Sequence, residues 1–322
     1  MKMRNLFYAL ALFAVVGCSD GGDSGSASNN NNTNNDNTGT GGNPSTEEFV
    51  PSFTPSYAAD DEIKVMSFNV RLMTTEDNYM NEWPYRKDAC FLMIKHQQPT
   101  IFGVQEAKYN DQYLEMKSAL ASSNYESYGL NRDNGQESGN GECMAIFYDK
   151  TKVKFIDGGT FWLSATPDQC SKGWDGACNR TATWGLFEHI ATGKTFCYIN
   201  THLDHKGDAA RLNGPKVIME RFAKYNPDGE YPQFLTGDMN LAPDHKALDA
   251  FEETMVNTRD AAPSNHTDRS ATYNGWKTTS NSIIDHIYCT QGMNVLEYHT
   301  VNENYGVDFI SDHYPIYAII KL

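Results

Sequence analysis

Residues 235–240 read Leu235-Thr-Gly-Asp238-Met-Asn240, an apolar, strand-like run that ends in a carboxylate and an amide. Two other segments have the same form, Tyr198-Ile-Asn-Thr-His202 and Ile310-Ser-Asp312-His313-Tyr-Pro-Ile316. Polar groups at the ends of strands meet at one edge of a sheet, where ligands bind and reactions take place. Carboxylate, amide and imidazole groups together suit a hard divalent cation that holds a phosphate oxygen. The segments therefore predict a sheet protein with a metal-assisted site at one edge.

Further strand-like runs end in residues of the same kinds. Ser67-Phe-Asn69-Val-Arg71 ends near an amide, Gln105-Glu106 ends in a carboxylate, and Asp285-His286 repeats the acidic and imidazole pair. Each short motif alone is common on solvated surfaces. Their order along the chain and their shared position at strand ends make the set specific.

Seven stretches rich in branched and aromatic residues are predicted strands: Ile63–Val70, Ile101–Gln105, Met144–Tyr148, Phe196–Thr201, Phe234–Thr236, Ile283–Tyr288 and Tyr314–Ile320. Helices are predicted at about Arg86–His96, from an N-cap at Asn110, at about Asp208–Lys224 with a kink or an interruption at Gly214-Pro215, and from Asp244. The last strand is expected to alternate polar and apolar positions. Strands and helices mix without strict alternation, which favours packed mixed sheets with helices outside over a parallel barrel.

The N-terminus has the form of a targeting segment. Lys2 and Arg4 precede the apolar run Leu6–Val16, which is too short to span a bilayer and fits a secretory signal over residues 1–17. Val15-Val16-Gly17-Cys18 resembles the bacterial lipobox, in which the Cys is lipidated; an ordinary signal peptide with an incidental Cys is the alternative.

The segment after Cys18 is polar, and residues 18–49 are expected to form the lipidated Cys and a disordered tether, because Gly, Ser, Asn, Asp and Thr cannot bury a core. Ser19 resembles an outer-membrane sorting signal. We therefore expect a lipid-anchored protein of the bacterial cell envelope, held at the outer membrane or cell surface. Residues 50–322 are expected to form one catalytic domain. The protein is expected to be a monomer.

The charge disfavours one class of partner. Without Lys2 and Arg4 the chain keeps 24 basic against 41 acidic residues, a net charge of −17. Proteins that grip long nucleic acids usually present a basic face, so extended nucleic-acid binding is disfavoured. A local site in which a metal supplies positive charge stays open.

The chain contains seven Cys. With Cys18 lipidated, six remain in an oxidising compartment, and Cys170 and Cys178 bracket a short loop that favours a disulfide. Pairing among the other four stays open, with buried free thiols as an equal alternative.

Together these motifs resemble the endonuclease/exonuclease/phosphatase superfamily, which includes DNase I, over nearly all of residues 62–322. Gly159-Thr-Phe-Trp-Leu-Ser164, Gly173-Trp-Asp175 and Arg180-Thr-Ala-Thr-Trp184 look most like a secreted bacterial branch. The resemblance implies a four-layer α/β/β/α sandwich of two packed mixed sheets, and a divalent-metal-dependent phosphoesterase.

The resemblance also implies roles for single residues. Glu106 would be the principal metal ligand, with Asn69 beside it and Asp312 nearby. Asp238 would orient or deprotonate the attacking water, and Asn240 would hold a phosphate oxygen or a second cation. His313 would bond a non-bridging phosphate oxygen, and Asp285 would support that imidazole. His202 would act as the general acid, with Glu142 orienting it. Arg180 would contact the phosphate.

Some of these roles have ordinary alternatives. Arg180 could form a surface salt bridge, and Glu142 could be a solvated edge residue. The absence of Cys from the set favours Mg²⁺ or Mn²⁺ over zinc. The expected substrate is a phosphomonoester or phosphodiester of a small molecule, sugar or lipid head group. The alternatives are a secreted nuclease and a binding lipoprotein that has lost the chemistry.

Overall fold

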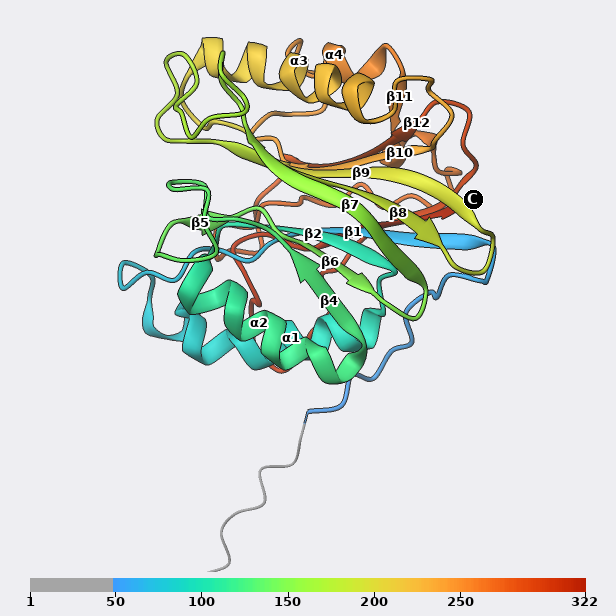
Figure 1. Cartoon of the computed structure of the whole chain (residues 1–322). Coiled ribbons are helices and arrows are strands. Elements are labelled where there is room, and N and C mark those ends of the chain that lie inside the picture. Colours follow the sequence, from blue (N-terminus) through green and yellow to red (C-terminus); the bar gives the residue numbers. More distant parts are fainter. Residues whose placement is uncertain (1–48) are drawn as a thin grey trace, which may run out of the picture. The chain divides into compact units, whose positions relative to one another are not determined.

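The computed structural model describes residues 49–322 (Figure 1). The expected signal peptide, Cys18 and most of the expected tether lie outside these residues. Among the described residues, no helix combines the length and the apolar character needed to cross a bilayer.

Two six-stranded sheets lie face to face. The first has the order β13-β14-β1-β2-β6-β4, and only its β1–β2 pair is parallel. Its strands are β1 (Glu62–Asn69), β2 (Ile101–Gln105), β4 (Tyr125–Tyr128), β6 (Ile146–Asp149), β13 (Val295–Thr300) and β14 (Ile316–Lys321). A two-stranded ribbon of β3 (Ala107–Lys108) and β5 (Glu142–Cys143) extends beyond β2.

The second sheet has the order β11-β12-β10-β9-β8-β7, and only its β9–β10 pair is parallel. Its strands are β7 (Val153–Trp162), β8 (Thr181–His189), β9 (Lys194–His202), β10 (Gln233–Asp238), β11 (Met255–Asn257) and β12 (Asp285–Thr290). Both sheets are therefore mixed.

Helices cover the outer faces of both sheets. α1 (Trp83–Gln97) and α2 (Leu114–Leu120) lie on the first sheet, and α3 (Asp208–Tyr225) and α4 (Asp249–Glu252) on the second (Figure 1). α1 begins with Pro84 in its first turn and is followed by its C-cap Gln98, which adopts a left-handed conformation. A short helix, α5 (Thr258–Ala261), follows β11. This is the predicted four-layer sandwich, so the fold prediction is confirmed.

Side chains that point between the two sheets form what we call the inter-sheet layer. Because alternate residues of a strand face opposite sides, β9 sends Phe196, Tyr198, Asn200 and His202 into this layer. β1, β2, β10 and β12 follow the same rule, and each changes from apolar to polar side chains towards one end of the sandwich, at Asn69, Gln105, Asp238 and Asp285. The polar side chains thereby gather at one end, which we call the catalytic rim.

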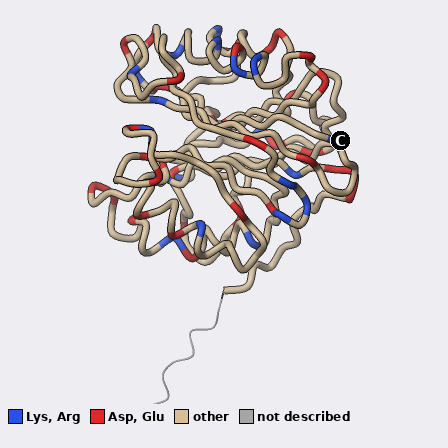
Figure 2. Tube along the Cα trace, in the orientation of Figure 1, with Lys and Arg blue, Asp and Glu red and all other residues tan. Residues whose placement is uncertain are grey.

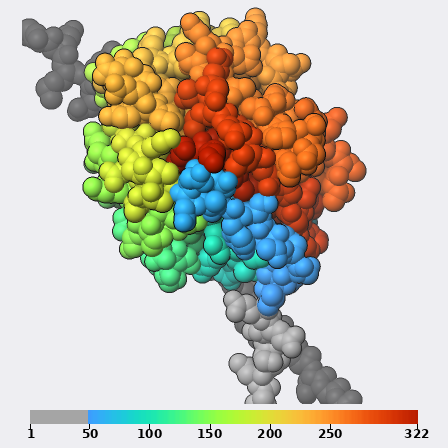
Figure 3. Space-filling model, turned by 90° about the vertical axis from the view of Figure 1, so that its right-hand side faces the viewer, coloured from blue at the N-terminus to red at the C-terminus, as the bar shows by residue number. Residues whose placement is uncertain are grey.

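The opposite end carries the chain's entry and exit. Figure 3 shows the segment before β1 beside the C-terminal strands on this face. The backbone N–H of Leu322 donates to the carbonyl oxygen of Asp61 at 2.9 Å, and Lys321 forms an ion pair with the Asp61 carboxylate at 2.9 Å. Acidic and basic residues are interspersed along the trace of both sheets (Figure 2).

Some local predictions were wrong. α3 is one helix from Asp208 to Tyr225 with Pro215 inside it, so Gly214-Pro215 does not interrupt it. Asn110 does not cap a helix, since a π-helical turn already starts at Tyr109. The residues after Asp244 form turns, and the helix begins only at Asp249; the last strand is buried on both faces rather than alternating.

The expected disulfide is also absent. Cys170 and Cys178 are both free thiols. The Cys170 thiol instead points to the carbonyl oxygen of Asp133, 3.2 Å away. The other described Cys residues (Cys90, Cys143, Cys197 and Cys289) are buried and free, one of the two alternatives that the sequence left open.

Candidate active site

Asn69 lies at the centre of the catalytic rim, at the end of β1. Its Nδ2 donates to Glu106 Oε1 at 3.0 Å and to Asp238 Oδ2 at 2.9 Å, so it links one carboxylate from each sheet. Its Oδ1 accepts the backbone N–H of Arg71 at 2.9 Å, which turns the amide oxygen away from the carboxylates. In this arrangement Asn69 is a hydrogen-bond donor to both carboxylates, and the metal-ligand role that the resemblance implies for it stays a prediction.

Glu106 is held by its backbone as well as by Asn69. It adopts a positive φ of 65°, which turns its side chain out of the strand that precedes it. Its Oε2 accepts the backbone N–H of Leu72 at 3.0 Å. Burial raises the pKa of this carboxyl, but the charge of His313 and the hydrogen bonds from Asn69 and Leu72 together lower it below its usual value.

His313 and Asp285 form a buried ion pair. His313 Nδ1 lies 2.8 Å from Asp285 Oδ2, and His313 Nε2 lies 3.7 Å from Asp238 Oδ2. Burial opposes the charge of His313, but Asp285 and Asp238 outweigh it and raise its pKa to about 10. Burial and the charge of Asp285 raise the pKa of Asp238 to about 7. At neutral pH the rim therefore holds a cationic imidazole next to a carboxyl that can gain or lose a proton.

His202 is the second imidazole of the rim, and it is neutral. Burial, followed by the charges of Arg180 and Arg132, holds its pKa well below the usual value. Asn240 Nδ2 donates to the carbonyl oxygen of Leu203 at 3.0 Å and lies 2.9 Å from His202 Nε2. Since an amide nitrogen can only donate, His202 Nε2 accepts and Nδ1 carries the proton. That Nδ1 is buried and has no hydrogen-bond partner among the described residues.

Asp312 completes the acidic group. Its Oδ2 lies 3.8 Å from Arg71 Nε, and burial raises its pKa, with a further contribution from the charge of Glu106. The neighbouring Ser311 donates its hydroxyl to the backbone oxygen of Asn69 at 2.7 Å, which ties the C-terminal segment to the end of β1.

Tyr273 covers the other side of His313. The two rings lie edge to face, with centroids 5.0 Å apart. The backbone N–H groups of the next two residues, Asn274 and Gly275, donate to the carbonyl oxygen of Asp312 at 2.8 and 3.0 Å. A loop far from His313 in sequence therefore fixes the position of this segment.

The donor set fits a hard divalent cation. Asp238 and Asp312 are buried and Glu106 is half-buried, and the charge of Glu106 raises the pKa of the other two carboxyls. A bound cation would relieve this repulsion, and carboxylate oxygens are the ligands that Mg²⁺ and Mn²⁺ prefer. Ligand atoms of Glu106, His202 and Asp238 all lie within 4.8 Å of one another. Glu106 and Asp312 would hold the cation.

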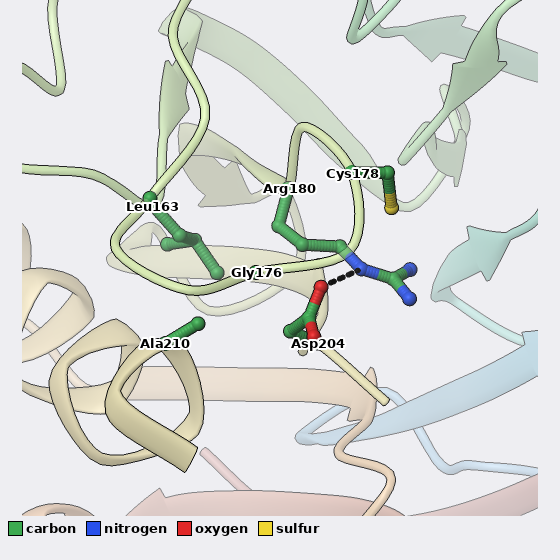
Figure 4. Close-up of a pocket in the computed structure, with 7 residues that line it drawn as sticks. Leu163, Gly176, Cys178, Arg180, Asp204 and Ala210 are labelled. Atoms are coloured by element: carbon green, nitrogen blue, oxygen red, sulfur yellow. Dashed lines mark ion pairs between the residues drawn. The ribbon is translucent and has the colours of Figure 1, made fainter. Parts of the chain in front are cut away.

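Glu142 and Arg180 lie beside the rim, each with a partner of its own. Glu142 Oε2 accepts Arg132 Nη1 at 2.5 Å, so the implied contact between Glu142 and His202 is not formed. The reason is that Arg132, ten residues earlier, supplies a closer cationic partner. Arg180 Nη2 lies 2.8 Å from His205 Nδ1, and Arg180 Nε lies 3.6 Å from Asp204 Oδ2 (Figure 4).

A hydrogen-bonded bridge behind the rim joins the two sheets. Asn200 on β9 donates to the backbone oxygens of Val104 at 2.8 Å and Ala145 at 3.0 Å, both in the opposite half of the sandwich. Its Oδ1 accepts Gln105 Nε2 at 2.7 Å. A Cβ atom on Gly103 would lie 2.1 Å from Asn200 Oδ1, so only glycine leaves room for this bridge.

The structure thus brings most of the implied site residues to one rim: Asn69, Glu106, His202, Asp238, Asn240, Asp285, Asp312 and His313. Sequence reasoning missed Arg71 and Tyr273 as members of the site, and Gly103 behind it. Arg71 follows Asn69 closely and could have been included. Tyr273 gives no such signal, because it lies 40 residues before His313.

Comparison with known proteins agrees with this geometry. The structure is similar to an endonuclease/exonuclease/phosphatase from Bacteroides vulgatus, with 31% identity, 81% of this chain and 99% of that chain covered, and a TM-score of 0.73. It is also similar to a mannosyl-6-phosphatase from Bacteroides thetaiotaomicron, with 29% identity, 81% of this chain and 100% of that chain covered, and a TM-score of 0.74.

More distant structures share the fold alone. The catalytic domain of human Nocturnin is 18% identical, with 82% of this chain and 96% of that chain covered and a TM-score of 0.65. No curated protein matches this chain. Residues 66–313 match the model of the endonuclease/exonuclease/phosphatase family. With most of its length in that match, and with a DNase I-like fold, the chain belongs to the endonuclease/exonuclease/phosphatase family.

Proposed function

We propose that this protein is a Mg²⁺- or Mn²⁺-dependent phosphoesterase that hydrolyses a small phosphorylated molecule, such as a sugar phosphate or a lipid head group. One observation carries the proposal: four carboxylates and two imidazoles of opposite protonation state meet at one rim. Membership of the family and the likeness to a mannosyl-6-phosphatase support hydrolysis of phosphate esters.

The cation would be held by Glu106 and Asp312, and it would supply positive charge to the phosphate oxygens. Water attacks phosphorus, the bond from phosphorus to the leaving oxygen breaks, and that oxygen gains a proton. Asp238 suits the attacking side, because a carboxyl with a pKa of about 7 can accept a proton from water at neutral pH.

The two imidazoles suit different tasks. His313 is held through Nδ1 by Asp285, so its Nε2–H is free to donate to a phosphate oxygen as negative charge grows there. His202 is neutral in the free protein. An incoming phosphate brings negative charge that favours the protonated form of His202, which can then give a proton to the leaving oxygen.

The test is metal-dependent turnover. The described domain, assayed with Mg²⁺ and with Mn²⁺ on phosphomonoesters and phosphodiesters, should release phosphate or the corresponding alcohol, and excess chelator should abolish this. Glu106→Gln is the matched control, since it removes the charge of the ligand at nearly constant volume. Full activity in excess chelator, or in the Glu106→Gln variant, would exclude the proposal.

We further propose that the enzyme works outside the cytoplasm, as a monomer anchored to the envelope through lipidated Cys18. The lipobox-like sequence supports this location, and the net charge of −17 without Lys2 and Arg4 supports a small substrate over extended nucleic acid. Cell fractionation of Cys18→Ser should move the protein from the membrane to the soluble fraction. A variant that stays with the membrane would contradict the anchor.

A further inference from the structure

Residues other than glycine that adopt a positive φ occur in the catalytic rim and elsewhere in the fold. The described residues contain seven such positions other than glycine: Arg71, Gln98, Glu106, Asn124, Trp174, Asn240 and Trp276. Gln98 and Asn124 end helices, and Arg71, Glu106 and Asn240 belong to the site described above. Two tryptophans remain. A bulky side chain at positive φ costs about 1–3 kcal/mol, so the surrounding structure must hold it there.

Packing accounts for Trp276 but not for Trp174. The Trp276 ring meets Phe309 edge to face at 6.4 Å, and the Arg86 guanidinium lies 5.6 Å from its centre. Trp174, with φ of 44°, is 40% exposed. Within residues 49–322 it has no aromatic, cation–π or side-chain hydrogen-bond partner. Its indole is therefore presented to solvent by the fold.

The loop that carries Trp174 is anchored on both sides. Asp175 accepts the backbone N–H groups of Ala209 at 3.2 Å and Ala210 at 2.9 Å, in the first turn of α3. Asp204 Oδ2 accepts the N–H of Ala177 at 2.9 Å. The hollow enclosed beneath the loop, shown in Figure 4, has no room for a water molecule. The loop is therefore a tightly packed support that holds the backbone of Trp174 in place.

The same anchor connects this loop to the site. Asp204 follows His202 by two residues, and its carboxylate lies 3.6 Å from Arg180 Nε. That Nε is buried and has no hydrogen-bond partner among the described residues, and the Arg180 charge lowers the pKa of His202. In Figure 1 the loop between β7 and β8 extends past its sheet at the same end as β5. The loop that carries Trp174 is thus held by Asp204, two residues after His202 on the chain.

We propose that Trp174 is a stacking platform for the leaving group, and that this group is a pyranose, so that the substrate is a phosphorylated hexose or hexoside. The inference rests on the proposed phosphoesterase function. The polarised C–H face of a pyranose packs on the negative face of an indole, while Arg180 offers its guanidinium to phosphate oxygens. The likeness to a mannosyl-6-phosphatase supports the same substrate class.

The test compares substrates that differ in the ring. Mannose 6-phosphate carries a pyranose, glycerol 3-phosphate carries no ring, and adenosine 5′-monophosphate carries an aromatic base. Trp174→Ala should raise the KM for mannose 6-phosphate by roughly 5-fold, from a stacking energy of about 1 kcal/mol, and that for glycerol 3-phosphate much less. Trp174→Phe should restore most of the affinity. Tyr231→Ala, an exposed aromatic position beyond the other end of α3, is the matched control and should change neither KM.

Several results would overturn the inference. If Trp174→Ala raised the KM for mannose 6-phosphate and for glycerol 3-phosphate equally, Trp174 would not recognise the sugar ring. If it raised the KM for adenosine 5′-monophosphate more than that for mannose 6-phosphate, the stacked group would be a base rather than a sugar. A lower melting temperature in Trp174→Ala would indicate a structural role, because an exposed indole without packing partners should not stabilise the fold.

Binding without turnover separates this inference from the proposed function. Mannose 6-phosphate should change the tryptophan fluorescence of Glu106→Gln, and the double variant with Trp174→Ala should lose that change. If the wild type hydrolyses none of the three esters with metal present, the proposed function fails. If it hydrolyses them and Trp174→Ala behaves like the wild type, only the sugar platform fails; absence of the fluorescence change also overturns the platform.

Discussion

The two ends of the inter-sheet layer differ in chemistry, although the same strands build both. On β9, Phe196 and Tyr198 face the layer at one end and Asn200 and His202 at the other, and all four are at most 4% exposed. The apolar end stabilises the fold by removing apolar surface from water. The catalytic end opposes folding, because it buries carboxylates near one another. Equally buried residues thus make opposite contributions to stability. Along a strand, stabilising positions can give way to destabilising ones within four residues.

The largest expected effect breaks the catalytic end. Asp238→Asn should lower kcat by about 10³-fold, since it removes the group that accepts the proton of the attacking water. The unfolding free energy should stay within about 1 kcal/mol of the wild type, because the substitution also removes a buried carboxyl whose pKa is raised to about 7. Steady-state kinetics and urea unfolding check both parts. A large loss of stability would contradict the comparison.

The matched substitution at the apolar end should lower stability and leave turnover nearly unchanged. Ile287 lies two residues beyond Asp285 on β12 and is fully buried. Ile287→Ala should lower the unfolding free energy by about 3 kcal/mol through lost transfer energy and a cavity. Turnover per folded molecule should change by less than about 2-fold. A loss of kcat in the fully folded variant would show that the two ends are not separable.

Gly103 lies at the border between the two ends, so its substitution should affect both properties. A Cβ there would lie 2.1 Å from Asn200 Oδ1 and 2.5 Å from Thr236 Oγ1, which forces the bridge between the sheets to move. Gly103→Ala should cost about 2 kcal/mol of stability and also lower kcat, because His202 follows Asn200 on β9. Urea unfolding and steady-state kinetics of Gly103→Ala check both parts. An unchanged kcat would show that the border between the apolar end and the catalytic end lies nearer the rim than Gly103.

The smallest expected effect is a pH dependence in the metal-free protein. His313 has a folded pKa of about 10, raised by Asp285 and Asp238 despite burial. A raised pKa gives stability that is complete below about pH 6.5 and is lost as pH rises towards 10. The unfolding free energy of the wild type should therefore fall over this range by about 1 kcal/mol more than that of Asp285→Asn. Lys64, whose pKa burial lowers to about 7, changes stability in the opposite direction, and the comparison with the variant cancels it.

The fold and the membership of the rim could be predicted from the sequence, because strands ending in His, Asp or Asn repeat in a fixed order. The strands β4, β7, β8, β11 and β13 and the short β3 and β5 were missed. β7, for example, is largely exposed in its middle and contains Gly158 and Gly159, so it lacks the apolar alternation of a strand. The sequence also could not show which partner each polar side chain takes. Glu142 pairs with Arg132, and Asn69 turns its amide nitrogen inwards, through contacts that only the folded chain brings together.

The gradient along the inter-sheet layer has a consequence for how such a protein can change over generations. On β1, β9, β10 and β12 only the inward-facing position nearest the rim contributes to chemistry, whereas the positions behind it hold the sheets together. A new specificity can therefore arise by replacing side chains at the rim and in the loops around it, without rebuilding the apolar half. The bridge of Asn200, Gln105 and Gly103 is the boundary that such variation has to respect.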